Sequence, residues 1–249
     1  AGQRRAIIKV RLVRLGANGL KSARTHLRYL ERAGVSRDGE PGRAYGPHTE
    51  VADTAEFIAA GDGDRHQFRV ILAPEDATEL GDLRGYIRGL MGRMEQDLGT
   101  RLEWIAVDHW DTDNPHTHLI IRGRDESGRD LIIAREYLTQ GLRLRAGELA
   151  TEWLGPRTER EIQASLTREI SQDRWTSLDR SLQRLAQDGQ VDLRVVPADV
   201  DERLRRSLLI GRLQQLGQMG LAHEANPSVW TIDPRAEQTL RDLGERGDI

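Results

Sequence analysis

The sequence predicts an α+β protein, with helices flanking a central antiparallel sheet and a smaller domain following it. Short apolar runs bounded by turn residues alternate with stretches whose apolar residues recur at helical spacing. Two of these runs, Glu103–His109 and Leu119–Ile121, are separated by Asp-Asn-Pro turn chemistry, which indicates an antiparallel hairpin. From about Ile170 the pattern changes, so we expect one domain over residues 1–165 and a second over 166–249.

The first domain is predicted to mix strands and helices along the chain. Strands are expected at 6–13, 66–73, 103–109 and 119–121. Helices are expected at 21–32, near 51–60 and at 137–153. Another helix is expected to begin after an N-cap at Asp76 and to run to Leu98. Residues 34–64 are otherwise rich in Gly, Asp and Pro and predict a long loop. Gly155-Pro156 should end the last helix.

The second domain is predicted to contain two helices, at 176–187 and 201–219, with a short strand at 191–196 between them. Asn226-Pro227-Ser228 predicts a hairpin turn before Trp230. This order resembles a winged helix, a DNA-docking variant of helix-turn-helix. Residues 146–249 carry 14 Arg against 18 Asp and Glu, which is an unusual charge balance for a domain that binds duplex DNA. The alternative is a wing that packs within the protein or binds a partner protein.

Composition narrows the class of protein. A chain of 249 residues can bury a substantial core, and 37% hydrophobic with 31% charged residues indicates a soluble protein. No apolar run reaches membrane-spanning length and no signal sequence is evident, so membrane insertion is not expected. Cysteine is absent, which excludes disulfides and thiolate metal sites and is compatible with a cytoplasmic location.

The overall charge of −3 conceals a strongly basic start. Residues 1–32 carry nine Arg and Lys against Glu31 alone. Such density suits a phosphate backbone, although a solvated face is the alternative. We therefore expect a local nucleic-acid footprint at this end of the chain.

Three of the seven histidines, His109, His116 and His118, fall within ten residues. Side chains two apart on a strand share a face, so His116 and His118 project together, and a hairpin brings His109 beside them. Neutral imidazole is the commonest protein ligand for divalent transition metals. We predict a three-nitrogen metal site; a solvated His-x-His face is the alternative.

Tyr29 lies on the predicted helix 21–32, among arginines that share one face. These are Arg24, Arg28 and Arg32, spaced at i, i+4 and i+8. A basic surround stabilises a phenolate where a phosphate would bind, so Tyr29 is a candidate nucleophile. A tyrosine beside leucines is otherwise most often half-buried core.

The histidine segment resembles a known motif. His109-x-Asp111-x4-His116-x-His118 is similar to the third motif of conjugative relaxases, mobilisation nucleases of the HUH endonuclease superfamily. Thr117 stands where the short triplet has a hydrophobic residue. Three further segments also resemble relaxases. His26–Arg32 resembles the first, tyrosine-bearing motif, and residues 66–76 resemble the relaxase pattern. Residues 154–159 resemble the segment that closes the catalytic unit in one relaxase subfamily.

The resemblance implies an HUH relaxase-like fold and a reaction. Tyr29 would attack a DNA phosphate at a plasmid transfer origin, forming a 5′-phosphotyrosyl bond and freeing a 3′-hydroxyl. His109, His116 and His118 would hold Mn²⁺ or Mg²⁺ against the phosphate oxygens, although three imidazoles suit Zn²⁺, Co²⁺ or Ni²⁺ equally. His109 is alternatively a proton acceptor for Tyr29.

Other residues receive supporting roles. Asp111 is expected to hydrogen-bond to one of the imidazoles and orient it, and a turn residue is the alternative. Single-stranded DNA is expected to contact the basic arm and further side chains, with accessory relaxosome proteins as additional partners. The expected DNA contacts are Arg24, Arg28, Arg32, Tyr45, which is also a reserve nucleophile, His66, Arg122 and Arg143.

Three rival functions stay open. A rolling-circle replication initiator or a transposase would use the same histidine chemistry. A metal hydrolase would activate water and use no tyrosine. A non-catalytic DNA-binding autoregulator would depend on the second domain.

Overall fold

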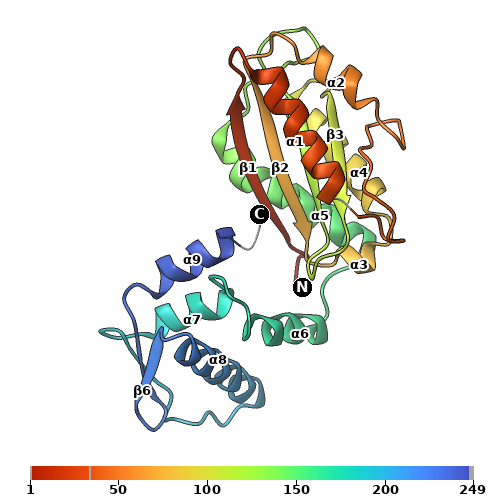
Figure 1. The fold of residues 1–249 in the computed structure, drawn as a ribbon. Helices are drawn as coiled ribbons and strands as arrows, with labels where there is room; N and C mark the ends of the chain where they lie inside the picture. Colours follow the sequence, from red (N-terminus) through yellow and green to blue (C-terminus); the bar gives the residue numbers. More distant parts are fainter. Residues whose placement is uncertain (1, 34, 247–249) are drawn as a thin grey trace. The chain divides into compact units, whose positions relative to one another are not determined.

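The computed structural model describes residues 2–33 and 35–246, and the chain divides into two compact units, Ala1–Arg157 and Thr158–Ile249 (Figure 1). The division falls eight residues before the predicted boundary, which would cut helix α6 (Glu159–Glu169). Thr158 begins this helix, which the sequence analysis did not predict, with a capping box to Glu161. Among the helices so described, none combines the length and apolar character needed to cross a membrane.

The first unit is built on a four-stranded antiparallel sheet, which confirms the predicted α+β class with flanking helices. Its strands are β1 (Ala6–Arg14), β2 (His66–Pro74), β3 (Trp104–His109) and β4 (His116–Arg122), in the spatial order β1-β2-β4-β3. The hairpin β3–β4 sets His109 directly opposite His116. On the outer side of β3, the backbone of Tyr45 pairs with Ala106, whereas β1 has no outer strand partner among the described residues.

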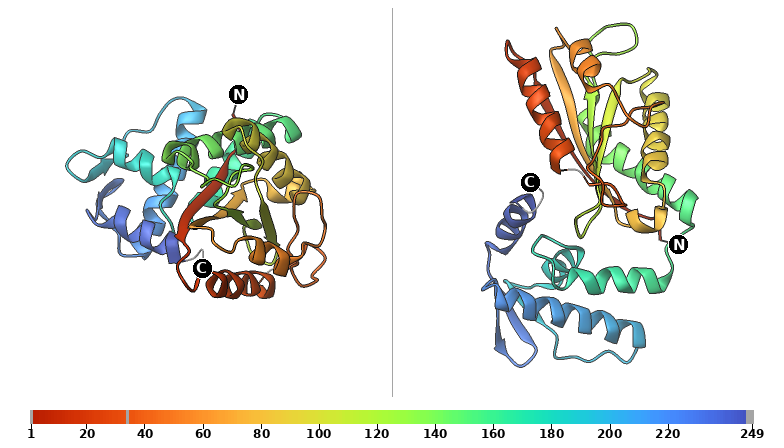
Figure 2. Two further views of the ribbon diagram at one scale, coloured as in Figure 1. Left: turned by 90° about the horizontal axis from the view of Figure 1, so that it is seen from above. Right: turned by 45° about the vertical axis from the view of Figure 1, so that its right-hand side comes forward.

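Helices cover both faces of this sheet (Figure 2). On one face, α1 (Gly19–Ala33) and α2 (Thr54–Ala60) bury apolar side chains against β3 and β4. On the other, α4 (Leu83–Leu98) and α5 (Leu142–Leu154) pack against the larger core. Because side chains alternate along a strand, Ile105, Val107 and His109 face α1, while Trp104 and Ala106 face the larger core.

The helix predicted from Asp76 to Leu98 is two helices, α3 (Ala77–Leu80) and α4. Gly81, at φ +73°, breaks them apart. Asp82 caps α4 by accepting from the Gly85 amide, whereas the Asp76 carboxylate makes no cap and forms an ion pair with Arg4 at 3.2 Å. The helix predicted at 137–153 begins with one π-helical turn, η1 (Tyr137–Gly141), and ends at Leu154.

The second unit continues from α6 with helices around a small sheet. Its elements are α7 (Ser177–Leu185), β5 (Gln190–Asp192), α8 (Val200–Gln218), β6 (Ala222–Asn226), β7 (Val229–Ile232) and α9 (Ala236–Arg246). The three strands pair antiparallel in the order β5-β7-β6. The strand predicted at 191–196 stops at Asp192, because Arg194 turns back to bond its carboxylate. Helix α9 was not expected from the sequence pattern.

A buried arginine holds this unit together. Arg212 of α8 is fully buried, and its guanidinium donates to both carboxylate oxygens of Asp179, at 2.8 and 2.9 Å. The same side chain donates to the carbonyls of Ile170, Gln172 and Arg174, at the connection between α6 and α7. Each N–H group of the Arg212 guanidinium therefore has an acceptor, which a buried guanidinium needs to offset its loss of hydration.

Candidate metal centre

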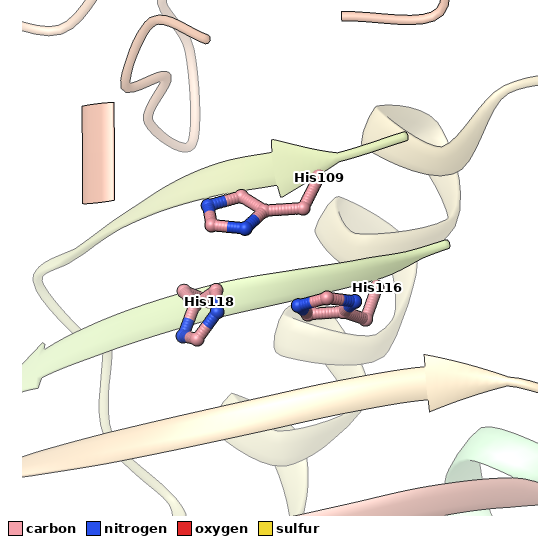
Figure 3. Close-up of side chains that lie close together, drawn as sticks. All are labelled: His109, His116 and His118. Carbon is pink, nitrogen blue, oxygen red and sulfur yellow. The ribbon is translucent and has the colours of Figure 1, made fainter. Parts of the chain in front are cut away.

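The three predicted histidines converge on the α1 face of the sheet (Figure 3). The donor nitrogens of His109, His116 and His118 all lie within 4.8 Å of one another. Ring centroids are 4.5 Å apart for His109 and His118, and 5.1 Å for each of the other two pairs. The geometry follows from the period of the strand and from the hairpin register, which sets His109 opposite His116.

Backbone carbonyls fix two of the imidazoles. His109 Nε2 lies 3.2 Å from the Leu30 carbonyl of α1, and His116 Nδ1 lies 2.9 Å from the Asn114 carbonyl in the hairpin turn. A carbonyl only accepts, so each of these nitrogens carries the proton. His109 Nδ1 and His116 Nε2 are then left with lone pairs, and both point toward the other rings (Figure 3).

Two of these imidazoles, His118 and His109, are held in the neutral form. Burial, together with the neighbouring imidazoles, His26 of α1 among them, lowers the pKa of His118 to about 3. Burial also lowers the pKa of His109, followed by the effect of His116. A neutral ring is the form that binds a metal.

The donor set fits a divalent cation. An ion with tetrahedral bonds of about 2.0–2.1 Å holds its nitrogens about 3.4 Å apart, so modest side-chain rotations would close this site. His116 and His118 are only half-buried, which leaves room for further ligands on the solvent side. Three protein nitrogens with open positions are typical of a catalytic centre rather than a closed structural one.

Asp111 does not orient the imidazoles in the way that was expected. Asp111 is exposed in the turn, and among the described residues its carboxylate makes no hydrogen bond to an imidazole. Its charge acts at longer range and tends to raise the pKa of His109. The carbonyls of Leu30 and Asn114 do the orienting. No side-chain pattern could have revealed them, because they belong to the backbone.

The four tyrosines of the chain differ sharply in their surroundings. Tyr86 donates to the Ala146 carbonyl and Tyr137 donates to Asp97, and burial raises the pKa of both. Tyr29 is 57% exposed, and its hydroxyl has no hydrogen-bond partner in the described part of the chain. It directly precedes Leu30, the residue bonded to His109, and follows His26 by one helical turn.

Tyr45 is buried, contrary to its expected role as a DNA contact or reserve nucleophile. Its side chain is 0% exposed, packs edge-on against Trp104 and donates a 2.8 Å hydrogen bond to Asp108. It therefore lies on the sheet face opposite the histidines. Burial and the Asp108 carboxylate raise the pKa of Tyr45 well above its usual range, which disfavours a phenolate.

Two other expected DNA contacts serve the structure instead. The His66 ring bonds the Leu131 carbonyl at 2.9 Å, and Arg122 is held by Asp64 and by Glu103. His66 begins β2 and Arg122 ends β4, so both lie at the end of the sheet away from His116. These carboxylates raise the pKa of Arg122 above its ordinary value and occupy its guanidinium.

The remaining expected contacts lie on helices. Arg24, Arg28 and Arg32 of α1 are all exposed. Arg143 is exposed on α5, which packs on the opposite sheet face, and donates to the Ile8 carbonyl at 3.4 Å. Of the two sets, only the α1 arginines share an element with Tyr29.

Comparison with known proteins gives one partial match. Residues 209–249 match a family described as "Protein of unknown function (DUF3363)". Within the described residues this stretch runs from the middle of α8 through the β6–β7 hairpin and α9. The curated proteins contain no match to the chain.

Proposed function

We propose that this protein nicks and rejoins single-stranded DNA by transesterification at a transfer origin, with Tyr29 as nucleophile. One observation carries the proposal: a three-imidazole site lies under α1, the helix that presents Tyr29 and a row of arginines. The reaction is inferred from the resemblance of the chain to relaxase motifs. Tyr45, the other candidate nucleophile, is buried, so Tyr29 is the tyrosine best placed to attack a phosphate.

In this mechanism the Tyr29 hydroxyl oxygen forms a bond to phosphorus, and the bond from phosphorus to the 3′ oxygen breaks. The leaving oxygen gains a proton and becomes the free 3′-hydroxyl, while the downstream strand stays on Tyr29 through its 5′ phosphate. The phenol proton needs an acceptor nearby. His26 lies one helical turn before Tyr29, and burial lowers its pKa to about 4, so its ring is neutral and offers a lone pair through which the proton can pass to solvent.

His109, His116 and His118 would hold the cation. A divalent metal bound there would supply a Lewis acid that offsets charge on the phosphate oxygens. His109 serves as a ligand rather than as a base in this proposal, since one ring nitrogen is bonded to Leu30 and the other faces the site. The resemblance favours Mn²⁺ or Mg²⁺, and the nitrogen donor set accommodates Zn²⁺, Co²⁺ or Ni²⁺.

For the second unit we propose a winged-helix role. Its order of helix, strand, helix and hairpin supports this, with β6–β7 as the wing. Its acidic balance favours docking to an accessory relaxosome protein over gripping duplex DNA.

The decisive experiment incubates the full chain and Mn²⁺ with single-stranded oligonucleotides that span the transfer origin of its own replicon. Label at the 3′ end is expected to move onto the protein, and label at the 5′ end to leave as a shorter strand. Tyr29→Phe should abolish the adduct and keep oligonucleotide binding. Tyr137→Phe is the matched control and should form adduct. An adduct that persists in Tyr29→Phe would overturn the assignment.

A further inference from the structure

A cavity of about 240 Å³ lies at the end of β3. Asp108 and Trp110 line it, and they flank His109 along the chain. Since neighbouring side chains on a strand point to opposite faces, this cavity opens on the other side of β3 from the histidines. Arginines complete the walls: Arg37 and Arg43 from the loop after α1, and Arg84 from α4.

The Asp108 carboxylate presents an acceptor to the cavity. Its Oδ1 accepts from the hydroxyls of Tyr45, at 2.8 Å, and Thr117, at 2.7 Å. The nearest cation to its Oδ2 is Arg84 Nε at 4.0 Å, which is too long for a hydrogen bond. Within the described residues Oδ2 has no donor, although the side chain is 8% exposed. A carboxylate oxygen that lines a cavity in this way can accept a hydrogen bond from an N–H or O–H group of a ligand.

The walls suit a flat ligand. The Arg37 guanidinium lies 5.3 Å from the centre of the Trp110 ring and is fixed by a hydrogen bond to the Gly81 carbonyl. The half-exposed Trp110 ring offers a stacking surface. Arg43 has no hydrogen bond or ion pair in the portion of the chain that the structure describes, so its five donors are available.

We propose that this cavity takes one guanine base of the bound single strand. The inference rests on the proposed function and deepens it, because it adds base recognition, on the sheet face opposite the histidines, to the strand that is nicked. Guanine presents N1–H and N2–H₂ donors to Asp108 Oδ2 and stacks on Trp110. On its other edge it offers two acceptors, O6 and N7, which a guanidinium such as Arg43 reads bidentately. Adenine and cytosine have an amino donor without that acceptor pair, and thymine has no amino group.

The test measures binding of the full chain to fluorescent eleven-nucleotide oligonucleotides, by anisotropy in EDTA. The strands are all-thymine except for a central dG, deoxyinosine or dT; deoxyinosine differs from dG only by lacking the 2-amino group. The wild type is expected to bind the dG strand about tenfold more tightly than the other two. Asp108→Asn keeps an oxygen for Tyr45 and Thr117 and replaces the acceptor with a donor. It should lose the dG preference and retain dT binding.

Asp113→Asn, in the exposed hairpin turn, is the matched control and should keep the preference. Trp110→Leu leaves the carboxylate intact and should also reduce the preference, which covers the case that Asp108→Asn does not fold. Equal binding of dG and deoxyinosine by the wild type would overturn the proposal, as would a preference that survives both cavity variants. This measurement needs neither metal nor covalent adduct. The proposal of guanine recognition can therefore fail while the proposal of DNA nicking stands, and the nicking proposal can fail while guanine recognition stands.

Discussion

The Leu30 carbonyl accepts a hydrogen bond from His109 Nε2 at 3.2 Å, which joins α1 to the histidine cluster. This single contact fixes the tautomer of His109 and, at the same time, the position of the helix turn that carries Tyr29. Because a metal would hold the His109 ring from its other nitrogen, metal binding and α1 packing should stabilise one another.

The first prediction concerns metal content. His116→Ala combined with His118→Ala should leave the purified protein without bound metal, because one nitrogen cannot hold the ion alone. Elemental analysis after loading and dialysis measures this. His223→Ala, exposed on β6, is the control and should bind as the wild type does. Unchanged metal content in the double variant would remove the basis for the site.

A second prediction follows from linkage. Metal at one hundred times its Kd should stabilise the first unit by about 2.7 kcal/mol, because it binds only the folded centre. Calorimetry of the full chain should show one transition moving upward with metal while the other stays in place. A scan in which metal moves both transitions, or neither, would contradict selective binding at the histidines.

Tyr45→Phe tests whether Tyr45 has a structural role while Tyr29 acts as the nucleophile. Removing the hydroxyl takes a donor from the buried Asp108 carboxylate and should cost about 1–3 kcal/mol of folding free energy. Thermal unfolding measures the loss, and adduct formation should persist below the lowered midpoint. Loss of adduct in a folded Tyr45→Phe variant would transfer the nucleophile role to Tyr45.

Salt dependence tests the basic face of α1. If Arg24, Arg28 and Arg32 each contact a phosphate, replacing all three with Gln should reduce the slope of log K against log salt by about 2. Anisotropy titrations with single-stranded DNA over a range of salt concentrations give the slope. Arg129→Gln, in the exposed loop after β4, should leave it unchanged. An unaltered slope in the triple variant would place the footprint elsewhere.

Arg212→Ala should destabilise the second unit by about 3–5 kcal/mol, because it leaves Asp179 buried without its charge partner. In calorimetry the metal-insensitive transition should fall or disappear. Arg235→Ala, which breaks an exposed pair with Asp233, should leave that transition nearly in place. Equal shifts in the two variants would show that the buried pair has no special weight.

The parts of the structure that sequence could predict are those set by local periodicity. Strand alternation and one hairpin are enough to bring His109, His116 and His118 together. Tyr45 could not be placed this way, because its burial depends on pairing with Ala106 across 61 residues of chain. The same holds for Arg122, whose partner Asp64 lies 58 residues away. The break at Gly81 was missed because an isolated glycine is tolerated in helices, and only the fold shows that it adopts a positive φ.

Among the described residues β1 has no strand on its outer edge, and such an edge can promote association between chains. An open edge nine residues long, with Ile7 and Leu12 partly exposed, is a template on which another chain can add a strand and begin to aggregate. Lys9, Arg11 and Arg14 lie along this edge, and charged side chains there discourage such pairing. Neutralising them should therefore lower solubility, whatever it does to nucleic-acid binding.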